Sequence, residues 1–242
     1  MLLLCALSVS AQNGFSLSGD YGIGLSYERK LTTLDYHDYY GKPWTFQSVI
    51  CKNANFNISY THGHWQFRTG IGYAVNGYTR SDKGETYYNI SSMGILQNGS
   101  IGLTTIPARS EKFYYPLISI PLLVGYHISL STKVSLTPHA GLSVTNNIKS
   151  HFRVKQDTTE YTFKIVNSDF DKGYKRTGWW ASASLDVAYH ITSRWDIFAG
   201  PHFDYMLTNM VKNEYWSYED CPLKLYKWTI SVGVTWKVSG KK

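Results

Sequence analysis

Hydrophobic and polar residues alternate along most of this chain with a period of two, which is the period of a β-strand. In the first such segment, residues 15–27, Tyr21 and Ile23 fall on one face and Asp20 falls on the other. Successive side chains of a strand point to opposite faces, so this segment is predicted to form one strand with an apolar and a polar face. Seven more segments show the same pattern, namely 54–62, 65–78, 114–128, 134–145, 179–191, 195–207 and 225–238.

The connections between these eight segments are alternately long and short. The short ones are 63–64, 129–133 and 192–194, and the four remaining connections are long. Tight turns at one end and extended loops at the other are typical of an up-and-down meander of hairpins. The segments are also long enough for a tilted bilayer crossing of about 9 to 11 residues. The sequence therefore predicts an all-β, eight-stranded antiparallel up-and-down barrel, with short periplasmic turns and long extracellular loops.

Aromatic residues mark the ends of the predicted strands, on the same face as the apolar residues. Amphipathic rings at both margins of an outward apolar band form the girdles of a transmembrane β-barrel. A soluble barrel with an apolar interior is the alternative, because period two alone does not distinguish inside from outside. The predicted girdle residues are Tyr60, Trp65, Tyr126, Tyr189, Trp195 and Trp236 at the turn ends, and Tyr27, Tyr114, Trp179, Tyr205, Tyr226 and Trp228 at the long-loop ends.

The composition and the N-terminal residues exclude a disordered chain and transmembrane helices, and they indicate that the protein is exported. The 242 residues are 43% hydrophobic, 16% aromatic and 17% charged, which excludes a disordered chain. After the first dozen residues no apolar run approaches the length of about 18 that a transmembrane helix needs. Residues 1–11 form an apolar stretch ending on Val9-Ser10-Ala11, which predicts a signal peptide and a mature barrel domain over 12–242.

Two cysteines remain after removal of the signal peptide, and they lie in the first and last long loops. Cys51 and Cys221 lack the spacing of a zinc site, so no metal centre and no cofactor are predicted. Closure of the barrel makes the first and last loops neighbours, and the exported location permits a disulfide. A Cys51–Cys221 disulfide and two independent thiols are equally compatible with the sequence.

Charged residues of both signs fall on the inward face. An eight-stranded barrel is just wide enough to be filled by its own side chains, so these residues are predicted to form a structural ion-pair and hydrogen-bond core. A narrow ion path or a catalytic cluster is the alternative. Ser143 and Ser182 could face the inward histidines, but no nucleophile-elbow pattern is present, so no catalytic residue is assigned and an enzyme is the less favoured hypothesis. The predicted network is Asp20, Glu28, Arg68, His139, Asp186, His202, Asp204 and Lys227.

Two segments carry a resemblance to a known family. They are residues 19–24, Gly-Asp-Tyr-Gly-Ile-Gly, and residues 115–126, Tyr-Pro-Leu-Ile-Ser-Ile-Pro-Leu-Leu-Val-Gly-Tyr. With the Ser10-Ala11-Gln12 cleavage region, they resemble the small outer-membrane β-barrel proteins of the Bacteroidetes type, the PorT-like family. The resemblance implies an integral outer-membrane barrel and admits an accessory of a secretion or uptake machine. Trp236 is followed by a short polar tail, whereas many such barrels end on an aromatic residue.

The long loops carry the remaining signals. Loop 146–178 has more basic than acidic residues, within a formal net charge of +7, which suits contact with lipopolysaccharide phosphates. An ordinary solvated loop explains this charge at least as well. Aromatic residues in the first and last loops could stack on sugars, dock a protein partner, or pack on one another. Nucleic acid is not a predicted partner. The leading hypothesis is a structural or interaction protein, and an outer-membrane lipid-modifying enzyme or a narrow channel is the alternative.

Overall fold

The computed structural model describes most of the chain between residues 13 and 238. Residues 1–12, which include the predicted signal peptide, lie outside the described residues, so that assignment stays a prediction. None of the residues that the structure describes forms a helix long and apolar enough to cross a membrane. The described ranges are 13–29, 45–81, 85–89, 102–106, 109–148, 151–156, 159–164, 175–209 and 224–238.

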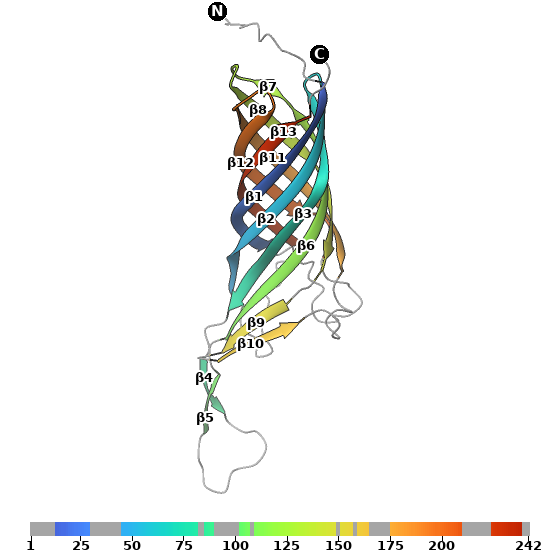
Figure 1. Ribbon diagram of the computed structural model, residues 1–242. Coiled ribbons are helices and arrows are strands. Elements are labelled where there is room, and N and C mark those ends of the chain that lie inside the picture. The colour runs from blue at the N-terminus through green and yellow to red at the C-terminus, as the bar shows by residue number, and fades with distance from the viewer. Residues whose placement is uncertain are drawn as a thin grey trace, which may run out of the picture.

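Eight long antiparallel strands close into a barrel (Figure 1). Each strand pairs with its neighbours in the chain, and the pairing of the last strand with the first, Ile230 opposite Ile23 for example, completes the ring. The predicted up-and-down eight-stranded fold is confirmed. The strands are β1 (Gly14–Arg29), β2 (Thr45–His62), β3 (Trp65–Ser81), β6 (Arg109–Tyr126), β8 (Val134–Asn147), β11 (Thr177–His190), β12 (Trp195–Met206) and β13 (Lys224–Lys237).

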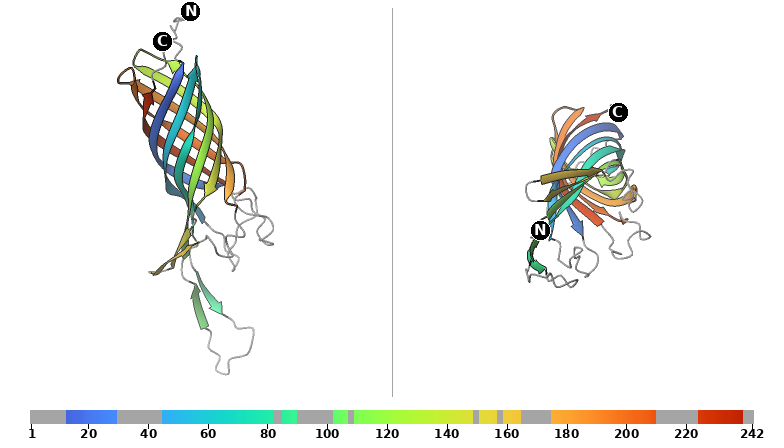
Figure 2. Two further views of the ribbon diagram at one scale, coloured as in Figure 1. Left: turned by 45° about the vertical axis from the view of Figure 1, so that its right-hand side comes forward. Right: turned by 90° about the horizontal axis from the view of Figure 1, so that it is seen from below.

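The connections contain short strands that the alternation pattern did not predict. A hairpin of β9 (His151–Gln156) and β10 (Thr159–Lys164) continues the sheet, because β9 pairs with the start of β6. A separate two-stranded sheet is formed by β4 (Glu85–Asn89) and β5 (Gly102–Ile106). Figure 2 shows both hairpins beyond one end of the barrel. Their strands are only five or six residues long, so the alternation along them is too short to stand out in the sequence.

The second barrel strand begins nine residues earlier than predicted, at Thr45 instead of residue 54. The register between β2 and β3 shifts between Ser48 and Lys52, which is a β-bulge. An extra residue in one strand reverses the alternation on its two sides, so the pattern before the bulge is out of phase with the pattern after it. Cys51 therefore lies in a strand, with its side chain buried, and the prediction that it belongs to a loop is wrong.

The turn end of the barrel carries the start of β1, the end of β13 and the short connections. Gly63 and His64 link β2 to β3, and Gly63 has a φ of 62°, in the left-handed region that favours glycine. Close to this turn, where His127 N donates to His64 O, the two-residue strand β7 (Ile128–Ser129) pairs with the start of β8. The turns predicted at 63–64, 129–133 and 192–194 all lie at this end.

The outer surface of the barrel is an apolar band. On β6, Ile118, Ile120, Leu122 and Val124 are all exposed, while the residues between them are directed inward. The same holds for Ile230, Val232 and Val234 on β13. An exposed apolar surface of this extent marks a membrane or protein contact, and the polar residues of the same strands occupy the interior.

Candidate functional site

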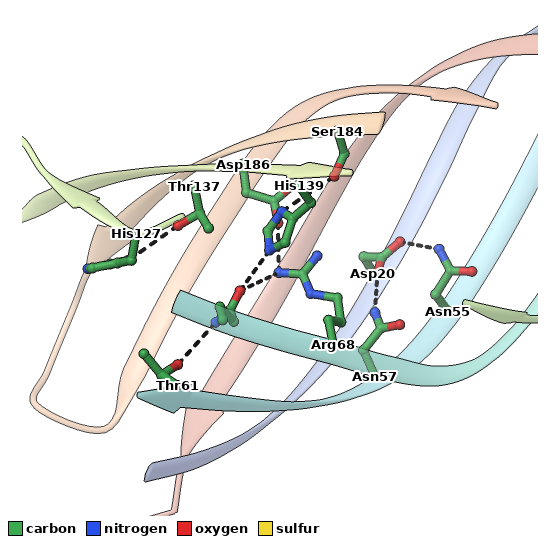
Figure 3. Close-up of polar contacts among 11 residues, drawn as sticks. Asp20, Asn55, Asn57, Thr61, Arg68, His127, Thr137, His139, Ser184 and Asp186 are labelled. Carbon is green, nitrogen blue, oxygen red and sulfur yellow. Dashed lines mark hydrogen bonds and ion pairs between the residues drawn. The ribbon is translucent and has the colours of Figure 1, made fainter. Parts of the chain in front are cut away.

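The polar interior is the place where the structure brings the predicted charged residues together (Figure 3). Arg68 on β3 and Asp186 on β11 form an ion pair across the lumen, with 2.8 Å between Nη2 and Oδ2. His139 on β8 lies beside the pair, and its Nδ1 atom is 3.6 Å from Asp186 Oδ2. The other ring nitrogen of His139 is 2.7 Å from Gln66 Oε1, which also accepts from Arg68 at 3.4 Å. Strands from both sides of the barrel are thus joined through one network.

A second cluster surrounds Asp204 on β12. Lys227 Nζ lies 3.1 Å from Asp204 Oδ2, and His202 Nε2 lies 3.1 Å from Oδ1. Ser182 Oγ donates to the same Oδ1 atom at 2.5 Å. Each of these side chains is buried or half-buried. The carboxylate therefore joins three strands, β11, β12 and β13, through charge-assisted hydrogen bonds.

Asp20 on β1 is held differently from the other two inward carboxylates. Its oxygens accept hydrogen bonds from the amides of Asn55 and Asn57 on β2, at 2.7 Å and 3.0 Å. Figure 3 shows each amide directed at a different oxygen of the Asp20 carboxylate. Sequence reasoning found Asp20 but not its amide partners. The side chain of Glu28, also predicted to belong to this network, lies outside the described part of the structure.

The serines and histidines of the interior do not have the order of a hydrolase triad. In such a triad the serine hydroxyl bonds to the histidine, and the histidine bonds to the carboxylate through its other nitrogen. Here Ser182 and His202 both bond to Asp204. Ser184 Oγ is 3.5 Å from His139 Nδ1, the same nitrogen that faces Asp186. These contacts support a hydrogen-bond core.

A third polar network at the turn end was missed from the sequence. Lys237 Nζ is 2.9 Å from Asp196 Oδ2, and His190 Nδ1 is 2.8 Å from Asp196 Oδ1. Their inward parity was readable in the sequence, but only the strand pairing places β11, β12 and β13 side by side. His127, beyond the last residue of β6, has its pKa lowered by burial and by the nearby His190 and Lys237.

An apolar plug fills the opposite end of the interior, where the long connections begin. Tyr115 and Leu225 are 0% exposed, and Trp180 donates its indole N–H to Thr145 Oγ1 at 3.0 Å. Tyr78 stacks on Phe113 with ring centroids 4.7 Å apart. The sequence prediction described the interior only as polar, and this part of it is wrong. We define the plug as Tyr78, Phe113, Tyr115, Leu117, Trp180, Met206 and Leu225.

A small cavity lies between the plug and the ion pairs. It has a volume of about 50 Å³ and is lined by residues of both, including Asp20, Arg68 and Trp180. At about 10 to 15 Å³ per water, this space holds about three to five waters. Asn76, which is 2% exposed, lines this cavity, and its two amide atoms have no hydrogen-bond partner among the residues that the structure describes. Water is the physical match for such a cavity. In the described residues, no group of three or more His, Cys, Asp or Glu side chains is arranged to hold a metal ion.

Comparison with protein families decides what this barrel is. The family model for the outer membrane protein beta-barrel domain matches residues 49–212, which is more than half of the chain. The chain belongs to this family. It is therefore an outer-membrane β-barrel protein, and its outward apolar band faces lipid. A search of curated proteins gave no match.

Solved structures of small outer-membrane barrels are similar to this chain at low identity. Neisserial surface protein A is 14% identical, with 93% of this chain and 97% of that chain covered and a TM-score of 0.43. The attachment invasion locus protein Ail of Yersinia pestis is 12% identical over 93% and 100%, with a TM-score of 0.37. The outer membrane protease OmpT from Escherichia coli is 9% identical over 96% and 99%, with a TM-score of 0.40.

The twelve predicted girdle residues all lie on the outward face of this outer-membrane barrel. The six at the turn end are exposed, and Trp65 packs edge-on against Tyr126 with centroids 5.3 Å apart. At the long-connection end, Tyr27 stacks on Tyr226 at 5.1 Å, and Trp179 and Trp228 are exposed. Rings at these two levels suit the two interfaces of a bilayer.

Cys221 lies outside the described residues, so the proposed disulfide stays a prediction. Its partner Cys51 points inward from β2 and is 1% exposed. A disulfide would have to reach this thiol inside the barrel wall, next to the β-bulge. The loop that carries Cys221 would therefore have to enter the barrel wall, which is a stricter requirement than contact between two surface loops.

Replacing Gly125 with alanine is expected to lower the free energy of unfolding by about 1 to 3 kcal/mol, the usual cost of overpacking. A Cβ atom at this inward position would lie 2.4 Å from Cδ2 of the buried His139 ring, which would have to leave Gln66. Urea unfolding in lipid vesicles, followed by tryptophan fluorescence, measures the change. Gly19→Ala is the control, because its Cβ would meet only the Asn55 carbonyl oxygen, at 3.9 Å. Equal effects of the two substitutions would contradict this account of His139.

Proposed function

We propose that this outer-membrane barrel has a structural or interaction role, in which the long connections lie outside the cell and bind a surface glycan, a lipid or a partner complex. The observation that supports this most strongly is the filled interior. The ion pairs and the plug surround a cavity of about 50 Å³, which has room for a few waters and not for a larger ligand. What remains available for binding is the part of the chain beyond the apolar band.

The sheet itself supports this role, because it continues past the barrel at the long-connection end. The strand β6 runs from Arg109, whereas its outward apolar residues begin only at Ile118. Its first residues pair with β9, and β10 is the edge strand of this extension among the described residues. An ordered extension on a rigid scaffold is a common way to present a binding surface.

The resemblance of residues 115–126 to PorT-like barrels supports a finer placement of the chain among them. A role as an accessory of a secretion or uptake machine follows from that resemblance as part of the proposal. An enzymatic role has less support, since the interior serines bond in an order that differs from a catalytic triad. A narrow channel would need a path through the plug.

Photo-crosslinking in intact cells tests this function. A benzophenone amino acid is placed at Tyr161, which is 53% exposed on β10, in otherwise unchanged protein. We expect an adduct of higher mass, identified by mass spectrometry as a surface glycan, lipopolysaccharide or a protein. The control position is Leu130, which is 57% exposed at the turn end.

If the long-connection end has an interaction role, the yield of adducts should be much higher from Tyr161 than from Leu130. Adducts only from Leu130 would place the binding surface at the turn end and contradict the proposed orientation. No adduct from Tyr161 in cells that express the folded barrel, as shown by heat-modifiable mobility on gels, would contradict the proposed role of the extension.

A further inference from the structure

Three cationic side chains form a row on the outward face of the β6–β9 pair. Lys112 on β6 lies directly opposite Arg153 on β9, and Lys155 lies opposite Ser110, two residues further along. Residues opposite one another in an antiparallel pair share a face of the sheet. All three cations are exposed, whereas Glu111, of opposite parity, is 1% exposed on the inner face. We call Lys112, Arg153 and Lys155 the cationic row.

The row contains an unfavourable contact that an anion would relieve. Like charges directly opposite one another destabilise a strand pair, and Lys112 and Arg153 occupy such positions. The nearby carboxylate of Glu160 is 3.6 Å from Arg153 Nη1, but the two side chains are 53% and 50% exposed. An ion pair so open to solvent contributes little. The row therefore keeps an excess of positive charge at its surface.

Two stacked rings, Tyr114 and His151, lie next to the row on the side toward the barrel, and we call them the aromatic step. The Tyr114 ring stacks on His151 with centroids 5.0 Å apart, and the Arg153 guanidinium lies 5.6 Å from the centre of the same tyrosine ring. These contacts fix the position of the Arg153 guanidinium beside the Tyr114 ring. From Tyr114 to Lys112 the strand rises about 7 Å, because each residue of an antiparallel strand adds about 3.4 Å.

Toward the turn end of the barrel, the same face of β6 becomes part of the apolar band. Tyr114 is followed on this face by the exposed Ile118, Ile120, Leu122 and Val124. Acyl chains beside these residues would place their headgroup at the level of the aromatic step and the row. A soluble phosphate would use only the cations. The continuity of the row with the band thus favours a phosphorylated lipid.

From this geometry we infer that the cationic row binds the phosphate of an outer-leaflet lipid of the lipopolysaccharide type, whose acyl chains lie along the outward face of β6. The inference rests on the proposed function, because it takes the long-connection end as the outer surface. Lys112 and Arg153 would each donate charge-assisted hydrogen bonds to the phosphate oxygens.

Lipid binding by the purified barrel in phosphatidylcholine nanodiscs tests the inference. The probe is diphosphoryl lipid A, retained on the barrel and measured by native mass spectrometry over a concentration series. We expect the variant with Lys112→Ser and Arg153→Ser to bind at least about tenfold more weakly, since two charge-assisted contacts are lost. Dephosphorylated lipid A should bind the unchanged protein as weakly as diphosphoryl lipid A binds the variant.

The matched control removes two exposed cations at the turn end, Lys133→Ser with Arg194→Ser, and should leave binding unchanged. Equal losses in both double variants would reduce the effect to net charge and overturn the site. Unchanged binding in the Lys112 and Arg153 variant would also overturn it, and so would full competition by inorganic phosphate. Nanodiscs present both sides of the barrel, so this result does not depend on orientation, whereas the crosslinking from Tyr161 does.

Discussion

Replacing Arg68 with leucine is expected to lower the free energy of unfolding of the barrel by about 3 to 5 kcal/mol, the range for breaking a buried ion pair from one side. The substitution leaves the Asp186 carboxylate, 2.8 Å from the lost guanidinium, without its cation. Both side chains are only 11% exposed, so water replaces the lost contact poorly. Equilibrium unfolding by urea in phosphatidylcholine vesicles measures the loss.

Two further variants separate the buried charge from lost packing. The double substitution of Arg68 and Asp186 by leucine removes both charges and should recover most of the lost stability, because no unpaired charge remains. Arg153→Leu is the matched control, since its ion pair with Glu160 is about half exposed and should contribute less than about 1 kcal/mol. Equal losses for Arg68→Leu and Arg153→Leu would show that the interior pair does not hold the barrel together.

Planar bilayers containing the folded barrel are expected to show no stepwise current in molar potassium chloride. A hydrated ion would have to pass Tyr115 and Leu225, which are fully buried in the plug, and then the Arg68–Asp186 pair. An apolar constriction without water is a barrier to ions. Insertion is verified on the same sample by heat-modifiable mobility. Current steps from the unchanged protein would contradict the filled interior and favour the channel hypothesis.

A plug variant locates the barrier. Tyr115→Ala with Trp180→Ala removes two rings of the plug, of which Trp180 also lines the cavity. Steps in this variant alone would place the main barrier at the plug. Continued silence, with folding retained, would place a second barrier at the ion pair, and adding Arg68→Ala should then produce current.

The candidate site was predictable from the sequence as a set of residues but not as a set of contacts. Inward parity identified Arg68, Asp186 and Asp204, since parity depends only on position along a strand. Their pairing depends on which strands lie side by side and on the stagger between them. Gln66 and Asn57 are neutral, so their positions did not stand out from those of other polar residues, although both complete the networks.

The plug shows where the alternation rule fails for a physical reason. Near Tyr115 and Trp180 both faces of the strands are apolar, because one face meets lipid and the other seals the lumen. Period two carries no contrast in such a segment. The start of β2 was hidden for another reason, the β-bulge that shifts the phase of the pattern, and the β9–β10 hairpin was hidden because its strands are only six residues long.

Alternation along the chain by itself determined that this protein has eight long strands, which face of each is apolar, and that tight turns and long connections alternate. Those properties are local, because side-chain direction in a strand depends on sequence position alone. The tertiary structure alone decided how the interior is divided into ion pairs, cavity and plug, and that β9 places Arg153 opposite Lys112. These are contacts between distant segments, which exist only once closure and register are set.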